Sequence, residues 1–224
     1  MGKQQYYNMY IIRITFPDIP LRTRDGHKLR GFFGNLFREH SPLLHNHFED
    51  GSLRYAYPLV QYKVIRGVAN LIGINEGAEL LADLFLKVKD LDIDGKVYPV
   101  LSKQIEHKQV EAGSTNDILT YQFLTPWLAL SQKNYQAYRQ ADEDARRELL
   151  KRILRGNILS MYKGLGVWAE RKLDAVVMVE ETEVHFKGKK MIGFHGKFGV
   201  NAIIPDLLGI GRSVSRGFGT VHRK

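Results

Sequence analysis

The chain has 224 residues, of which 44% are hydrophobic and 25% charged, and its formal net charge is +9. That length allows one large core or two domains of roughly 100 residues each. The sequence contains no cysteine, which excludes disulfides, thiolate metal sites and a cysteine nucleophile, and suits the cytoplasm. No apolar run approaches the ~18 residues of a membrane span, and the start does not resemble a signal peptide, so we expect no membrane contact.

The first half of the chain predicts a strand, a helix, two strands, a helix and a final strand. The first helix carries Leu29, Phe32 and Phe33 at helical spacing, and Pro42 marks its end. The last region contains an Asp-Gly turn, which is typical of a hairpin. This order is that of the split βαβ, or ferredoxin-like, unit. The six predicted elements are residues 9–17, 27–40, 57–65, 68–74, 76–88 and 91–100.

The second half of the chain is less regular. It predicts a strand, a long helix and then strands with Gly-rich turns, at residues 118–126, 142–162, 175–180, 183–188 and 190–204. Residues 111–115 (EAGST) favour a domain boundary. The expected fold class is therefore α+β, with tandem ferredoxin-like (βαββαβ) domains over residues 1–112 and 113–224, the second modified and ending in a C-terminal glycine-rich loop.

Positive charge gathers in the last part of the chain. Residues 185–224 hold eight lysines and arginines against Asp206 alone. Such a basic sector on a near-neutral body favours a polyanionic partner, nucleic acid before a membrane. A solvated, solubilising surface is the alternative interpretation.

Two patterns resemble metal sites. The run DLDIDG begins like a calcium loop, but the twelfth position from Asp90 is Leu101 instead of a bidentate glutamate. His45 and His47 could begin a hydrolytic metal site, but the sequence identifies no further ligands for it. We therefore predict no metal and no other cofactor.

Residues 207–224 read LLGIGRSVSRGFGTVHRK. This run lacks the third glycine of a dinucleotide-binding loop and the helix that would follow it. It also copies only the first half of an RNA-recognition strand. What remains is a segment whose glycines expose backbone N–H groups and whose polar side chains can donate to phosphate oxygens. Those side chains belong to Arg212, Ser213, Ser215 and Arg216.

The stretch GIGRSVSRGFG places Gly-hydrophobic-Gly, five residues and a second Gly-hydrophobic-Gly in a row, at Gly209, Gly211, Gly217 and Gly219. This spacing resembles the C-terminal glycine-rich loop of the repeat-associated mysterious protein (RAMP) superfamily of CRISPR systems. Within that superfamily, the chain is similar to the endoribonucleases that cut CRISPR precursor RNA within its repeats. The length, the tandem plan and the stretch PLVQYKVIRGVANLIGI agree with this, whereas residues 90–185 match loosely.

The resemblance implies a cleavage that needs no metal, in which the 2′-hydroxyl attacks the adjacent phosphate and leaves a 2′,3′-cyclic phosphate and a 5′-hydroxyl. Such a reaction needs a base, an acid and cations for the phosphorane. In the family the histidine lies in or just after the first helix. We assign His45 and His47 to catalysis, because a loop after a helix suits catalytic groups. His40 is the next candidate, and solvated loop histidines are the alternative.

Lysines and arginines supply the other candidate RNA ligands. Lys28, Arg30 and Arg38 on the first helix lie nearest to the proposed histidines, while Arg54 and Lys63 are weaker candidates. The cations of the long helix are more simply explained as a solvated face; they are Arg146, Arg147, Lys151, Arg152 and Arg155.

The expected partner is CRISPR repeat RNA, and both a homodimer and membership of a CRISPR effector complex stay open. A non-catalytic RAMP subunit that holds guide RNA in an effector complex is the alternative function. It would share the fold and the glycine-rich loop without needing the histidines. A third reading is a sequence-tolerant RNA-binding protein unrelated to CRISPR.

Overall fold

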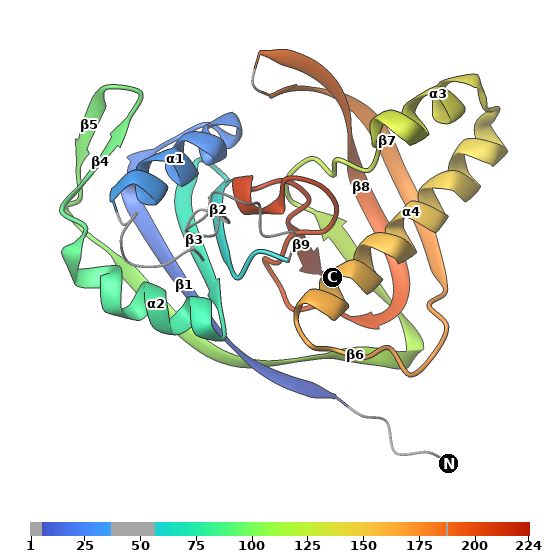
Figure 1. The fold of residues 1–224 in the computed structure, drawn as a ribbon, viewed down its shortest axis with the longest axis horizontal. Helices are drawn as coiled ribbons and strands as arrows, with labels where there is room; N and C mark the ends of the chain where they lie inside the picture. Colours follow the sequence, from blue (N-terminus) through green and yellow to red (C-terminus); the bar gives the residue numbers. More distant parts are fainter. Residues whose placement is uncertain (1–5, 37–56, 187) are drawn as a thin grey trace, which may run out of the picture. The chain divides into compact units, whose positions relative to one another are not determined.

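The computed structural model describes residues 6–36, 57–186 and 188–224 (Figure 1). Its contacts divide the chain into two compact units. The N-terminal unit consists of Asn8–Val110 and Val214–Gly217, and the C-terminal unit consists mainly of Glu111–Ser213 and Phe218–Lys224. Within the described ranges, no helix is both long and apolar enough to cross a membrane.

The N-terminal unit is a sheet in the strand order β2-β3-β1-β6, with α1 and α2 packed on one face (Figure 1). This antiparallel order with two helices is ferredoxin-like, so the predicted fold class is confirmed. The elements are β1 Tyr7–Pro20, α1 Gly26–Leu36, β2 Val60–Ile65, β3 Val68–Ile74, α2 Glu76–Leu84 and β6 Gln104–Phe123. Short 3₁₀ turns, η1 Thr23–Asp25 and η3 Phe85–Lys87, precede α1 and follow α2.

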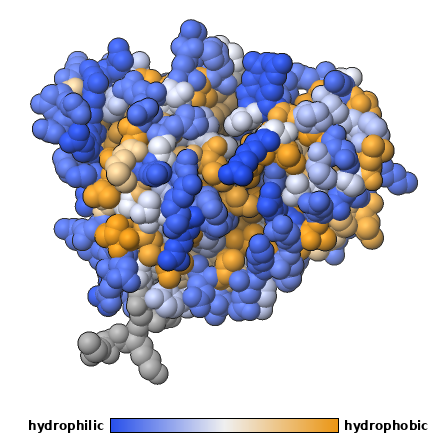
Figure 2. Space-filling model, turned by 180° about the vertical axis from the view of Figure 1, so that it is seen from behind, coloured by the Kyte–Doolittle hydropathy of each residue, from blue (hydrophilic) through white to orange (hydrophobic). Residues whose placement is uncertain are grey.

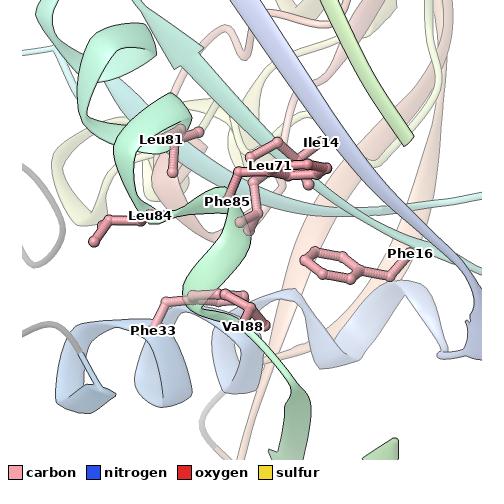
Figure 3. Close-up of a pocket in the computed structure, with 8 residues that line it drawn as sticks. All are labelled: Ile14, Phe16, Phe33, Leu71, Leu81, Leu84, Phe85 and Val88. Carbon is pink, nitrogen blue, oxygen red and sulfur yellow. The ribbon is translucent and has the colours of Figure 1, made fainter. Parts of the chain in front are cut away.

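The core of this unit lies between its helices and its sheet, because successive strand residues point to opposite faces. Phe33 of α1 stacks on Tyr62 of β2 with ring centroids 5.7 Å apart. A small cavity of about 10 Å³ lies in this core, and Figure 3 shows the apolar side chains that line it. A volume of that size holds roughly one water, and the lining offers no polar partner. The cavity is therefore a packing gap and not a ligand site.

The fourth strand of this sheet differs from the prediction. Residues 91–100 do form a hairpin, with β4 Asp90–Ile93 paired to β5 Lys96–Pro99, but the hairpin is a separate two-stranded sheet. Its turn is closed by the Gly95 N–H, which donates to Asp92 Oδ1 at 2.8 Å. The first part of β6 takes the fourth place beside β1 instead.

The C-terminal unit is a sheet in which β6 pairs with both β8 and β9, and β8 pairs with β7. The helix α4 packs on β7 and buries Leu150, Leu154 and Ile158. Aromatic rings fill the core, where Phe123 stacks on Trp127 at 5.3 Å between centroids. The elements are α3 Gln132–Gln140, α4 Glu143–Gly164, β7 Ala175–Phe186, β8 Lys189–Ile203 and β9 Val221–Arg223.

Local structure in this half differs from the prediction at two places. Residues 111–115, predicted as a domain boundary, lie within β6, which runs without interruption from Gln104 to Phe123, and the contacts of the chain divide between Val110 and Glu111. The predicted strands 175–180 and 183–188 are one strand, β7. The helix α3 was not predicted; Ser131 caps its start by accepting from the Asn134 N–H at 3.3 Å.

Candidate nucleic-acid interface

A short segment from the end of the sequence belongs to the N-terminal unit. The 3₁₀ turn η4 (Val214–Arg216) contacts both α1 and β2. Two glycines allow this close packing. A Cβ at Gly26 would stand 2.6 Å from the Arg216 carbonyl oxygen, and a Cβ at Gly217, whose φ is +91°, would stand 2.9 Å from the Tyr62 carbonyl oxygen. Any larger residue would therefore push η4 away from α1 and β2.

The packing of η4 brings two guanidinium groups together. Arg30 of α1 and Arg216 of η4 are both partly buried. Loss of solvent lowers the pKa of Arg30, and loss of solvent followed by the positive charge of Arg30 lowers the pKa of Arg216. The two cations therefore repel each other in a partly dry environment.

Beside this pair lies a fully buried lysine. Lys63 of β2 has no exposed surface, and burial lowers the pKa of its ammonium group to about 7. A Cβ on Gly217 would come within 3.3 Å of the Lys63 Cα, so η4 lies directly against this part of the strand. Burial of the neighbouring Tyr62 raises the pKa of its hydroxyl group. The sequence signal for Lys63 is a single charged residue inside the mainly apolar strand YPLVQYKVI.

Lys63 belongs to a polar row across the sheet. Its strand partner is Asn70 of β3, whose partner on β1 is Thr15. Asn70 Oδ1 accepts from Arg13 Nε at 2.8 Å and from Thr15 Oγ1 at 3.4 Å. The residues directly before and after Lys63, Asn70 and Thr15 in the sequence are apolar and face the helices. The polar row therefore occupies the opposite face of the sheet.

Lys28, predicted as a phosphate ligand, already has anionic partners. Its ammonium group lies 3.1 Å from Asp25 and 2.8 Å from Asp94. Hydrogen bonds to Asp94 and then to Asp25 raise the pKa of Lys28. The residue before it, His27, donates from Nδ1 to the Arg24 carbonyl oxygen at 2.7 Å.

The glycines of GIGRSVSRGFG have structural tasks within the protein. In the C-terminal unit, Gly211 adopts a φ of +97°, and a Cβ there would stand 2.7 Å from Trp127 Nε1. Gly219 adopts a φ of +64°, donates to the Pro126 carbonyl at 2.9 Å and accepts from the Ile210 N–H at 2.9 Å. Gly209 is buried and forms a β-bridge with Thr220. These contacts account for the spacing of the glycines without RNA, so RNA contact by the glycines stays a prediction.

The polar residues between the glycines are accessible. Arg212 is exposed, while Ser213, Ser215 and Arg216 are partly exposed. The Arg212 N–H donates to the Leu128 carbonyl at 3.2 Å, which holds its backbone to the C-terminal unit. The structure thus presents the side chains, more than the glycine backbone, to a ligand.

Five candidate residues lie outside the described residues. They are Arg38, His40, His45, His47 and Arg54, within the range 37–56. Their assignment stays a prediction. Of the first-helix candidates within the described ranges, Arg30 lies beside Arg216, and Lys28 lies beside Asp25 and Asp94.

Comparison with known proteins covers both units. The Cas6b N-terminal domain family matches residues 7–111, and the Cas6b C-terminal domain family matches residues 113–224. A crystal structure of Cas6b superimposes with a TM-score of 0.93 at 40% identity, over 97% of this chain and 100% of the other. A second, named CRISPR RNA processing endoribonuclease Cas6b, gives 0.80 at 38% identity over the same shares.

Two further similarities are one distant structure, which supports the same fold, and one relative found by sequence. The type IV CRISPR-Cas endonuclease Csf5 has a TM-score of 0.56 at 10% identity, over 97% of this chain and 100% of the other. An uncharacterized protein of Methanocaldococcus jannaschii is 45% identical over 144 residues, which are 64% of this chain and 98% of that protein. The tandem ferredoxin-like fold and the match to a CRISPR RNA processing endoribonuclease place the chain in the class of CRISPR-associated endoribonucleases. Within that class, the chain belongs to the Cas6b family.

Proposed function

We propose that this chain cleaves CRISPR precursor RNA within its repeats. The observation that supports the proposal is the Cas6b match across both units, together with 38% identity to a protein named as a CRISPR RNA processing endoribonuclease. The proposed reaction is attack of a 2′-hydroxyl on the adjacent phosphate without a metal ion, with release of a 5′-hydroxyl. His45 and His47 carry the proton transfers in this proposal, and His40 is the next candidate. The predicted cytoplasmic location stays a prediction.

Arg30 and Arg216 are the proposed phosphate ligands in the N-terminal unit. Their mutual repulsion and partial burial make a bound phosphate more favourable here than beside a fully hydrated arginine. In this proposal Lys63 is too deeply buried to contact the RNA, and it packs against the backbone at Gly217, directly after η4. Arg212 and Ser213 would donate to the RNA backbone from the C-terminal unit, and Ser215 would donate from the N-terminal unit.

The test is a single-turnover cleavage assay on repeat RNA in the presence of EDTA. We expect cleavage at one position, with a 2′,3′-cyclic phosphate on the upstream product. A substrate with a single 2′-deoxynucleotide at that position should bind and stay intact. Cleavage of the deoxy substrate would overturn the 2′-hydroxyl mechanism. Tight binding of repeat RNA without any cleavage would favour the alternative of a non-catalytic RAMP subunit.

A further inference from the structure

The turn after α4 exposes one of the two tryptophans of the chain. Trp168 has 73% of its surface exposed, whereas Trp127 is fully buried and donates from Nε1 to Asn157 at 3.1 Å. Exposure of a single apolar residue is ordinary, and Figure 2 shows hydrophobic residues scattered between hydrophilic ones on one face of the protein. Trp168 is different because it lines a groove.

The groove lies in the C-terminal unit, between the end of α4 and the loop that follows it. Its volume is about 480 Å³, and it is open to solvent on one side. Leu159, which is 46% exposed, and Trp168 supply apolar surface, and Lys163 supplies a positive charge. An apolar ring, open space and a cation in one groove match the two parts of a nucleotide, its base and its phosphate.

A row of cations leads along α4 to this groove. Arg152, Arg155 and Lys163 share one helical face with Leu159, since they are spaced by three or four residues from their neighbours in the row. The opposite face carries Leu150, Leu154 and Ile158 into the core. From Arg152 to Lys163 the row is ~16 Å long, enough for several phosphates. A Cβ at Gly156, on the same face, would meet nothing within 4 Å, so this surface is open.

The cations of this row differ from the others on the helix. Arg147 lies 2.9 Å from Glu143 and 3.1 Å from Asp144, and Lys151 lies 2.6 Å from Glu148. Across the described part of the chain, no such carboxylate partner is found for Arg152, Arg155 or Lys163. Residues 152–172 contain five lysines and arginines against Glu170 alone. The surroundings of Trp168 are therefore complementary to a polyanion, and the exposed indole ring offers a surface on which a nucleic-acid base can stack.

We propose that the surface formed by Arg152, Arg155, Leu159, Lys163 and Trp168 binds a single-stranded RNA segment, with an unpaired base stacked on Trp168. The inference rests on the proposed function only in taking RNA as the ligand. It places a second contact on the C-terminal unit, separate from the proposed cleavage residues. Stacking on an aromatic ring tolerates any base, so this surface suits RNA segments that flank a repeat and vary in sequence.

The experiment uses intrinsic fluorescence of the full chain and a short oligouridylate as the probe. We expect the probe to quench the exposed tryptophan of the wild-type protein and to leave the emission of a Trp168→Phe variant unchanged, since only buried Trp127 then remains. Trp168→Ala should weaken oligouridylate binding by roughly 5- to 150-fold, the range for loss of one stacked base. Arg152→Ala with Lys163→Ala should weaken it further at low salt, and Arg147→Ala is the matched control on the same helix.

Two outcomes would overturn the inference. One is normal cleavage of repeat RNA by a wild-type protein whose tryptophan emission does not respond to oligouridylate. The other is a protein that self-associates through this surface, so that Trp168→Ala changes its mass in light scattering and leaves RNA binding unchanged. Quenching without any cleavage of repeat RNA would instead count against the proposed function and leave the RNA surface intact.

Discussion

Gly26, the first residue of α1, packs directly on the backbone of Arg216, which is 190 positions later in the sequence. A methyl group at Gly26 would stand 2.6 Å from the Arg216 carbonyl oxygen, a distance that forces one of the two segments to move. Since Arg216 is a proposed phosphate ligand, this contact links the start of α1 to the position of a binding residue.

We therefore expect Gly26→Ala to destabilise the protein by about 1–3 kcal/mol and to weaken RNA binding, because η4 must shift. Gly31→Ala is the matched control, since Gly31 lies on the same helix and an added Cβ there meets nothing within 4 Å. The control should stabilise α1 by up to ~1 kcal/mol and leave RNA binding unchanged. Urea unfolding and filter binding measure both effects. Equal behaviour of the two variants would show that the contact with Arg216 does not matter.

The buried lysine predicts a pH dependence of stability. The folded-state pKa of Lys63, about 7, is lower than its usual value of 10.5, so between these pH values the unfolded chain holds a proton that the folded chain lacks. Its contribution to the free energy of unfolding should then rise with pH by up to ~1.4 kcal/mol per unit across that window and stay constant below about pH 7. Lys63→Met removes this contribution, so its stability advantage over the wild type should be largest at pH 6 to 7 and should shrink towards pH 10 in urea titrations. A constant difference would contradict the assignment.

Local sequence patterns predicted most of the N-terminal unit, and the reason is physical. The apolar positions of α1 and α2 repeat at helical spacing, and β2 and β3 are short apolar runs joined at Gly67, whose φ is +84°. The patterns failed where pairing partners are distant. The run 91–100 has a good hairpin sequence, but the strand that lies beside β1 is β6, which begins later in the chain at Gln104.

The candidate site was harder to predict from local sequence patterns than the fold. Arg30 and Arg216 were both named as candidates from the sequence, but their proximity depends on η4 packing in the N-terminal unit. No local pattern indicates that four residues near position 215 join a sheet formed before residue 111. Trp168 gave no signal at all, because one tryptophan in a loop can be buried or exposed.

The arginines of the glycine-rich segment predict a salt effect. Arg212→Ala and Arg216→Ala should each reduce the magnitude of the log–log salt slope of RNA binding by ~0.7–0.9, the value for one phosphate contact. Melting temperatures should change little, because Arg212 is exposed and Arg216 is partly exposed. Arg147→Ala, which removes an arginine already held by two carboxylates, serves as the control and should leave the slope unchanged. An unchanged slope in both test variants would remove this segment from the RNA interface.

The histidine assignment predicts a loss of rate without a loss of affinity. His45→Ala or His47→Ala should lower the single-turnover rate on repeat RNA by roughly 10²- to 10⁴-fold, the usual contribution of general acid–base catalysis. RNA affinity should stay near that of the wild type. If both variants cut at the wild-type rate, the assignment is wrong and His40→Ala becomes the decisive variant.

Gly211 and Gly188 separate backbone strain from steric clash. Both have positive φ, +97° and +72°, but an added Cβ meets Trp127 Nε1 at 2.7 Å only at Gly211. Gly188→Ala should therefore cost about 1 kcal/mol, whereas Gly211→Ala should cost about 1–3 kcal/mol more. Thermal unfolding of the two variants gives the comparison. Equal costs would mean that the indole of Trp127 moves aside freely.

The membership of Val214–Gly217 in the N-terminal unit has a consequence for how the protein is made. A ribosome produces residues 8–110 long before it reaches position 214, so the contacts of η4 with α1 and β2 can form only after the early sheet and its helices have been made. Closing so long a loop is entropically costly and slow compared with pairing neighbouring strands. A chain interrupted before that point has Arg30 without Arg216, so it lacks one of the two proposed phosphate ligands of the N-terminal unit.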